Sequence, residues 1–241
     1  MSTAEIVSIL LEGGSSVTAV NEDGSTALHL AARYSNAEIV SILLEGGSNV
    51  TAVNEDGSTA LHLAARYSNA EIVSILLEGG SSVTAVNEGG RTALHNAALM
   101  STAEIVSILL EGGSSVTAVD EDGSTALHLA ARYSNAEIVS ILLEGGSNVT
   151  AVNGDGSTAL HLAARYSNAE IVSILLEGGS SVTAVNERGR TALHNAALKS
   201  NAEIVSILLE GGSSVTEVDN VSVLIQAMLI GDPRLTVVPC T

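Results

Sequence analysis

The stretch NEDGSTALHLAARYSNAEIVSILLEGGSNVTAV, from Asn21 to Val53, recurs five more times along the chain with few changes. The further copies begin at Asn54, Asn87, Asp120, Asn153 and Asn186. A period of 33 residues is typical of a solenoid, in which each unit buries its apolar face only by stacking on its neighbours. The sequence therefore predicts one continuous array of six full repeats over residues 21–218.

Each copy predicts two short helices. In the first copy, Asp23-Gly24 favours a hairpin tip, because this dipeptide suits the positive φ angles of a tight turn. Residues 26–34 then have the apolar, partly very small side chains of a short helix. Ser35-Asn36-Ala37-Glu38 has the S-x-x-E form of a capping box and predicts the start of a second helix. Gly46-Gly47 predicts its end, because glycine can adopt the left-handed conformation that closes a helix.

These residues carry a family resemblance. G-x-T-A-L-H-L-A-A followed by A-E-I-V-S-I-L-L-E-G-G resembles the ankyrin repeat, whose signature is close to G-x-T-P-L-H-x-A-A and then E-I-V-x-x-L-L. The resemblance covers all six copies and implies an all-α, ankyrin-type solenoid of stacked helix-turn-helix repeats with hairpin-like fingers. It also implies a non-enzymatic protein–protein interaction scaffold that binds through the finger tips and the concave face of the first helices.

One departure from the family has an energetic consequence. The glycine that the family places between the two helices is serine in every copy, at Ser35, Ser68, Ser101, Ser134, Ser167 and Ser200. A left-handed serine at this position would carry roughly 1 kcal/mol of strain in each copy.

Composition restricts the partners. The net charge is −18 with only nine basic residues, which argues against nucleic acid and against an anionic membrane surface, and favours a protein partner with basic patches. Cys240 is the single cysteine, so the chain lacks a disulfide framework. The sequence also lacks a secretion signal and an apolar run long enough to span a bilayer, and we therefore expect a cytoplasmic protein.

The residues that could support chemistry favour structural roles. All six histidines occupy one repeat position, at His29, His62, His95, His128, His161 and His194. Stacked layers would separate them by about 8–10 Å, too far for one metal ion to bridge. The resemblance suggests a structural Thr–His hydrogen bond instead. Asp120-Glu121-Asp122-Gly123 begins like a calcium loop but lacks the bidentate Glu at its twelfth position. Because no nucleophile–base–orienter set is recognisable, we expect no enzymatic activity, no metal and no cofactor.

Copies three and six share a set of differences from the other four copies. Arg91 and Arg190 replace serine, Asn96 and Asn195 replace leucine, and Leu99 and Leu198 replace arginine. Met100 and Lys199 stand where the other copies have tyrosine. The true period is therefore 99 residues, and residues 1–119 differ from residues 100–218 at six positions, among them Gly89 against Arg188.

The resemblance places partner contacts at the finger tips and at the exposed end of the first helix. Tyr and Arg are also favoured at interaction hot spots. The candidate contact residues are Arg33, Tyr34, Arg66, Tyr67, Arg91, Leu99, Met100, Arg132, Tyr133, Arg165, Tyr166, Arg188, Arg190, Leu198 and Lys199. One hypothesis is that the acidic, acidic, basic rhythm along the fingers recognises a partner with its own repeated basic sites. The alternative is that a duplicated block of three repeats carries these differences by descent.

The two ends differ from the full copies. Residues 1–20 match residues 100–119, which predicts a partial N-terminal repeat consisting of the second helix alone. Residues 219–241 predict a divergent, truncated C-terminal capping repeat. We expect a monomer, with self-association through the uncapped N-terminal end as an alternative. Two further function classes stay open: a structural spacer or engineered array without a dedicated partner, and the binding arm of a larger protein.

Overall fold

The computed structural model describes residues 2–34, 36–67, 69–100, 102–133, 135–166 and 168–214. Within these ranges the chain forms thirteen helices and no regular strand. Their bounds are α1 Thr3–Glu12, α2 Ala27–Arg33, α3 Ala37–Glu45, α4 Ala60–Arg66, α5 Ala70–Glu78, α6 Ala93–Met100, α7 Ala103–Glu111, α8 Ala126–Tyr133, α9 Ala136–Glu144, α10 Ala159–Arg165, α11 Ala169–Glu177, α12 Ala192–Leu198 and α13 Ala202–Glu210. The prediction of an all-α chain is confirmed.

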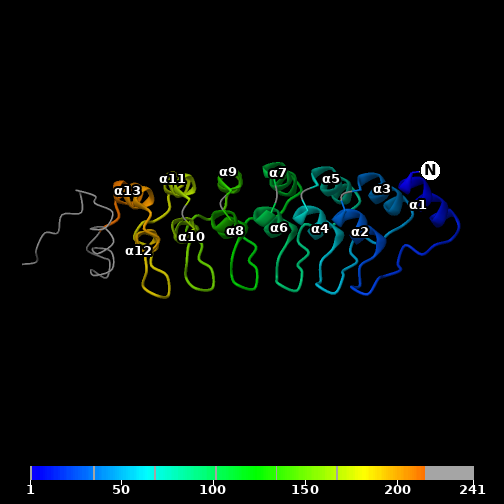
Figure 1. Ribbon diagram of the computed structural model, residues 1–241, viewed down its shortest axis with the longest axis horizontal. Coiled ribbons are helices and arrows are strands. Elements are labelled where there is room, and N and C mark those ends of the chain that lie inside the picture. The colour runs from blue at the N-terminus through cyan, green and yellow to red at the C-terminus, as the bar shows by residue number, and fades with distance from the viewer. Residues whose placement is uncertain are drawn as a thin grey trace, which may run out of the picture. The chain divides into compact units, whose positions relative to one another are not determined.

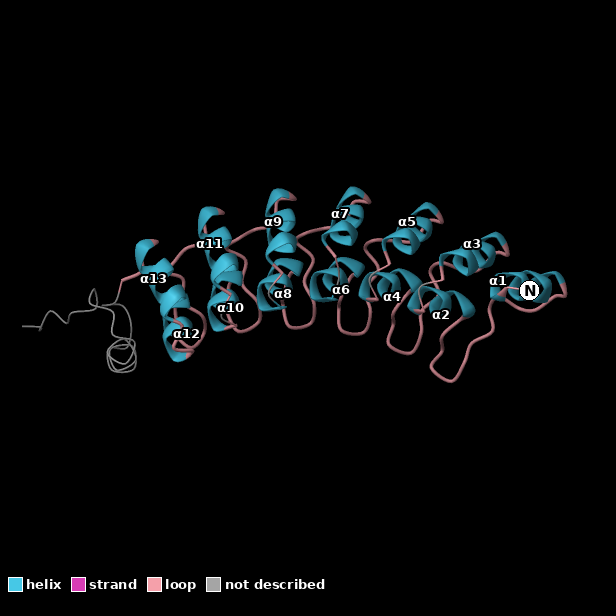
Figure 2. Cartoon of the chain, turned by 45° about the horizontal axis from the view of Figure 1, so that its top comes forward, coloured by secondary structure: helices cyan, strands magenta, loops and turns pink. Residues whose placement is uncertain are grey.

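The chain divides into two compact units, Met1–Glu121 and Asp122–Thr241. In the first unit, α2, α4 and α6 form an inner row and α1, α3, α5 and α7 an outer row, with each helix packed on its neighbours in the row (Figure 1). In the second unit, α8, α10 and α12 are inner helices, and α9, α11 and α13 are outer helices. Within each unit the loops that precede the inner helices project to one side as fingers (Figure 2).

The core of each repeat lies between the inner and outer rows. Ile72, Val73 and Leu76 of the outer helix α5 are fully buried, and their spacing puts them on one helical face. The inner helix α4 contributes Ala64 and Ala65, which are also fully buried. Small alanine side chains let successive inner helices approach closely, so a chain without Phe or Trp still builds a close-packed core.

Apart from α1, the outer helices begin one residue later than the S-x-x-E pattern predicts. In α3 the N-cap is Asn36, whose side chain accepts a hydrogen bond from the Ile39 amide at 3.0 Å. The predicted capping box at Ser35 is therefore wrong, because the asparagine that follows is itself a strong N-cap residue. In α1, Ser2 and Glu5 do form the reciprocal box, whereas α7, which has the same four residue types, takes Thr102 as its N-cap.

The ends of the outer helices agree with the prediction. Gly47 at the end of α3 has φ 84°, and the amide after it, that of Ser48, donates to the Leu43 carbonyl at 2.9 Å. This is the left-handed glycine closure expected from Gly46-Gly47.

The inner helix α12 ends with a serine in the same left-handed conformation. Ser200 has φ 55°. Its amide donates to Ala197 at 2.9 Å, and the next amide, of Asn201, donates to Ala196 at 3.2 Å. Together these bonds form a Schellman motif with serine in the position that favours glycine. The left-handed serine is therefore present at Ser200, whereas the five equivalent serines lie outside the described residues.

Helix α1 presents an open apolar face. Ile6, Ile9 and Leu10 are 45%, 52% and 53% exposed. The predicted C-terminal capping repeat at residues 219–241, with Cys240, lies outside the described residues.

Candidate protein-interaction surface

Each finger is shaped by the asparagine that opens the repeat. In the first copy, the Asn21 side-chain oxygen accepts from the amides of Asp23 and Ser25, and the Asn21 carbonyl accepts from Gly24 at 3.1 Å. Gly24 has φ 67°. Among the described residues other than glycine, only Ser200 has a positive φ, so Asp23 does not share this conformation. The predicted tip is therefore correct for Gly24 and wrong for Asp23, because the asparagine side chain closes the turn.

Within each unit the finger tips are joined by backbone hydrogen bonds. In the first unit the Glu55 amide donates to the Asp23 carbonyl at 3.1 Å, and the Glu88 amide donates to the Asp56 carbonyl at 3.0 Å. The second unit repeats the pattern, with bonds of 3.0 Å and 2.7 Å from Glu187 to Asp155 and from Gly154 to Asp122. These bonds fix the spacing of successive tips within a unit.

The histidines join one repeat to the next. His29 Nδ1 accepts from the Thr26 amide at 3.2 Å and lies 2.8 Å from Thr26 Oγ1, while Nε2 lies 2.9 Å from the Ser58 carbonyl. Because a backbone amide can only donate, Nδ1 is unprotonated and Nε2 carries the proton. Burial lowers the pKa of His29, His62 and His161 below their ordinary value, which keeps the rings neutral. The predicted Thr–His hydrogen bond is confirmed.

The part of the chain that the structure describes holds neither a metal-binding cluster nor a membrane-spanning helix. It contains no group of three or more His, Cys, Asp or Glu side chains arranged to hold a metal ion. The helices it describes are also all too short or too polar to cross a bilayer. Asp120, the first residue of the calcium-like segment, is a buried carboxylate that lies 3.4 Å from Arg91 Nε.

Tyrosine and arginine side chains stack at the C-terminal ends of the inner helices. In the first unit the Arg33 guanidinium lies 5.8 Å from the ring centre of Tyr34 and 5.6 Å from that of Tyr67, and Arg66 lies 5.9 Å from Tyr67. The second unit has the same arrangement at 5.4–5.8 Å, formed by Arg132, Tyr133, Arg165 and Tyr166. The four rings remain between 40% and 72% exposed. Cation–π contacts thus hold them in place while leaving them accessible.

Copy three replaces this stack with apolar side chains. Met100 is 63% exposed at the end of α6, and Leu99 beside it is half-buried. Asn96, which replaces a leucine, is buried and donates from Nδ2 to the His62 carbonyl at 3.1 Å. Arg91 is half-buried beside Asp120.

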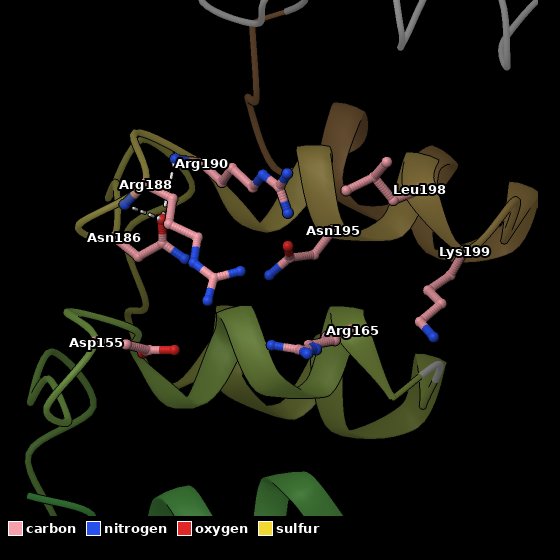
Figure 3. A pocket seen from close by; sticks show the side chains of 8 residues that line it. All are labelled: Asp155, Arg165, Asn186, Arg188, Arg190, Asn195, Leu198 and Lys199. Atoms are coloured by element: carbon pink, nitrogen blue, oxygen red, sulfur yellow. Dashed lines mark hydrogen bonds between the residues drawn. The ribbon is translucent and has the colours of Figure 1, made fainter. Parts of the chain in front are cut away.

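Copy six brings its candidate residues together around a pocket of about 240 Å³ in the second unit. The lining comprises Asp155, Arg165, Asn186, Arg188, Arg190, Asn195, Leu198 and Lys199 (Figure 3). Arg188 and Arg190 come from the finger, whose Asn186 side-chain oxygen accepts from both of their amides at 3.0 and 3.1 Å. Leu198 and Lys199 lie at the end of α12, and Arg165 lies at the end of α10. Five of the sequence candidates therefore share one pocket.

Sequence reasoning missed two sets of surface residues. The valine before each opening asparagine or aspartate is 54–61% exposed, at Val20, Val53, Val86, Val119, Val152 and Val185. The sequence could have pointed to this valine, because it occupies the same position in every repeat. Asp155, Asn186 and Asn195 line the pocket but were not candidates; for Asn195 the replacement of leucine was a usable signal.

Comparison with known proteins identifies the class. The family model described as Ankyrin repeats (3 copies) matches residues 2–87, 79–153 and 145–219. The chain therefore belongs to the ankyrin repeat family, whose members are generally protein-interaction modules and typically lack enzymatic activity. A search of curated proteins finds no match.

Proposed function

We propose that this chain is a non-enzymatic protein-interaction scaffold that binds a partner through its finger tips and the exposed ends of its inner helices. The observation that supports this most directly is the recurrence of exposed tyrosine, arginine and valine side chains on a framework fixed by hydrogen bonds. Tyrosine and arginine supply large contact areas at hot spots, and a rigid framework reduces the ordering cost of binding. The candidate contact residues of copies one to six are retained as this proposed surface.

The charges on the fingers suggest the chemistry of the partner. In the first unit, fingers one and two present the exposed carboxylates of Glu22, Asp23, Glu55 and Asp56, while finger three carries Arg91. A partner with basic sites at the spacing of successive repeats would complement this pattern of two acidic fingers followed by a basic one. The net charge of −18 would speed its encounter.

Assembly and location are part of the proposal. We infer a cytoplasmic monomer made of a partial repeat over residues 1–20, six full repeats over 21–218 and a capping repeat over 219–241. The open apolar face of α1 is the place where two copies would associate. Sedimentation at increasing concentration tests this, because the monomer predicts a constant molecular mass.

A spacer without a dedicated partner is the second candidate, favoured by the near identity of the copies. A pull-down from cell extract with the wild type and with Arg91→Ser/Arg190→Ser separates the two functions. The scaffold predicts a specific protein that the double variant retains less well. A spacer predicts the same background proteins from both. Serine occupies this position in four copies, so the variant should fold normally.

A further inference from the structure

The pocket of copy six has a charge opposite to that of the chain. Four of the nine basic residues in the sequence line it, at Arg165, Arg188, Arg190 and Lys199. Asp155 is the only carboxylate among the described residues that line it, so the formal charge of these residues is +3 in a chain of net charge −18. Several positive charges around one pocket focus a positive electrostatic potential on any group that enters the pocket.

The cationic side chains come from both walls of the pocket. Figure 3 shows Arg188 and Lys199 reaching from copy six toward α10, where Arg165 lies along the opposite wall. Guanidinium groups offer planar pairs of donors that match the two oxygens of a carboxylate or phosphoryl group. The Asn195 amide is already engaged, because Nδ2 donates to the His161 carbonyl at 3.0 Å. The cationic side chains are therefore the groups available to an anion.

The two 99-residue blocks differ in charge around this pocket. Three of the six differences make the second block more positive here than the first. The second block has Arg188 where the first has Gly89, Lys199 where the first has Met100, and Gly154 where the first has Glu55. Gly154 is the chain neighbour of the pocket residue Asp155. All three residues are exposed, so the core does not require them. The corresponding part of the first unit has two cations, Arg66 and Arg91.

We propose that the pocket of copy six binds an acidic segment of a protein partner, whose anionic side chains enter the pocket that Arg165, Arg188 and Lys199 help to line. This inference rests on the proposed scaffold function and adds a second kind of contact to it. A protein segment fits better than nucleic acid, because the exposed carboxylate of Glu187 stands in the chain between the lining residues Asn186 and Arg188. A continuous phosphate backbone would be repelled there, whereas a peptide can place a single acidic group in the pocket.

The test uses the full chain and three fluorescein-labelled peptides in fluorescence anisotropy. One peptide carries a run of glutamates, the second has phosphoserine in place of the central glutamate, and the third has glutamines throughout. The proposal predicts binding of the first two and none of the third, with affinity falling as salt is added. The relative affinity of the first two tells whether a carboxylate or a phosphoryl group is preferred.

The variants restore residues that other copies already contain. Arg188→Gly with Lys199→Met recreates the residues of copy three and should weaken binding roughly tenfold or more. Arg190→Ser should also weaken it, whereas the matched change in the first unit, Arg91→Ser, should leave it unchanged. Circular dichroism spectra and melting temperatures verify folding.

Equal binding of the glutamate and glutamine peptides would overturn the inference, as would equal losses from Arg91→Ser and Arg190→Ser. Tighter binding of a single-stranded oligonucleotide than of the acidic peptides would also overturn it. If the pull-down partner is retained while the acidic peptides fail to bind, this inference falls and the scaffold function stands. Loss of specific capture in the pull-down removes the scaffold function as well.

Discussion

Replacing Ser81 by alanine should raise the free energy of unfolding. Ser81 follows the glycine pair at the end of α5, and its Oγ atom is buried without a hydrogen-bond partner in the described part of the chain. Its backbone amide donates to the Leu76 carbonyl at 2.9 Å, a bond that the substitution leaves intact. The equivalent hydroxyl is in the same state in every copy, at Ser48, Ser81, Ser114, Ser147, Ser180 and Ser213.

The size of the effect follows from the cost of a buried, unsatisfied polar atom. Leaving such a hydroxyl without a partner costs about 1–3 kcal/mol, whereas the void left by removing one oxygen costs only a fraction of this. We expect a gain of about 1 kcal/mol for Ser81→Ala. Equivalent sites in successive repeats are about 8–10 Å apart and should act independently, so all six substitutions together should add several kcal/mol.

The next residue supplies a matched control. Ser82 Oγ accepts from the Thr84 amide at 3.2 Å and lies 2.9 Å from Thr84 Oγ1, so Ser82→Ala should lower stability by about 0.5 kcal/mol. Urea unfolding followed by circular dichroism measures both changes, because the chain has no tryptophan to report by fluorescence. A lower midpoint for Ser81→Ala, or shifts of both variants in the same direction, would refute the reasoning.

Three further predictions concern the backbone and the histidines. Ser200→Gly should raise stability by about 0.5–1 kcal/mol, because relief of the left-handed strain exceeds the entropic cost of glycine; Ser200→Ala, which keeps Cβ, should give no gain in the same urea titration. Gly57→Ala should lower stability by more than 1 kcal/mol, roughly, since φ is 68° and the new Cβ would lie 2.9 Å from the Glu88 amide nitrogen; a melting temperature equal to that of the wild type would contradict this. The unfolded chain takes up protons at its histidines near pH 6.5, before the buried His62 and His161 do. The urea midpoint should therefore fall as the pH is lowered from about 7 through 6.5, and this loss should level off below the folded-state pKa values; a midpoint that rises over this window would contradict the neutral-histidine assignment.

Much of the fold could be predicted because one pattern is repeated six times. The 3.6-residue periodicity and the flanking glycines locate both helices of each copy to within a residue or two. The N-cap was wrong by one position because Ser35 and Asn36 are adjacent and both residue types are good caps. Local preference alone does not decide between them. The Thr–His bond was inferred through the resemblance, and its geometry agrees.

The surface was only partly predictable, because it depends on contacts between repeats. The exposed Tyr–Arg pairs could be located, since the two residues are neighbours in the chain. The contact of Arg33 with Tyr67 joins adjacent repeats and depends on side-chain direction, which periodicity does not determine. The pocket of copy six likewise draws on residues from Asp155 to Lys199, and its volume depends on how the finger and the ends of α10 and α12 leave space between them.

The way the repeats are joined explains how their surface can vary while the framework stays the same. His29 donates to the carbonyl of Ser58, and His62 donates to the carbonyl of Arg91, each at 2.9 Å. The acceptor is a backbone atom in both cases, so the bond does not depend on which side chain occupies that position. The finger ladder also uses only backbone amides and carbonyls. The fingers can therefore exchange serine for arginine, or glycine for arginine, without loss of these bonds, and this permits copies three and six to carry a different binding chemistry on the same scaffold.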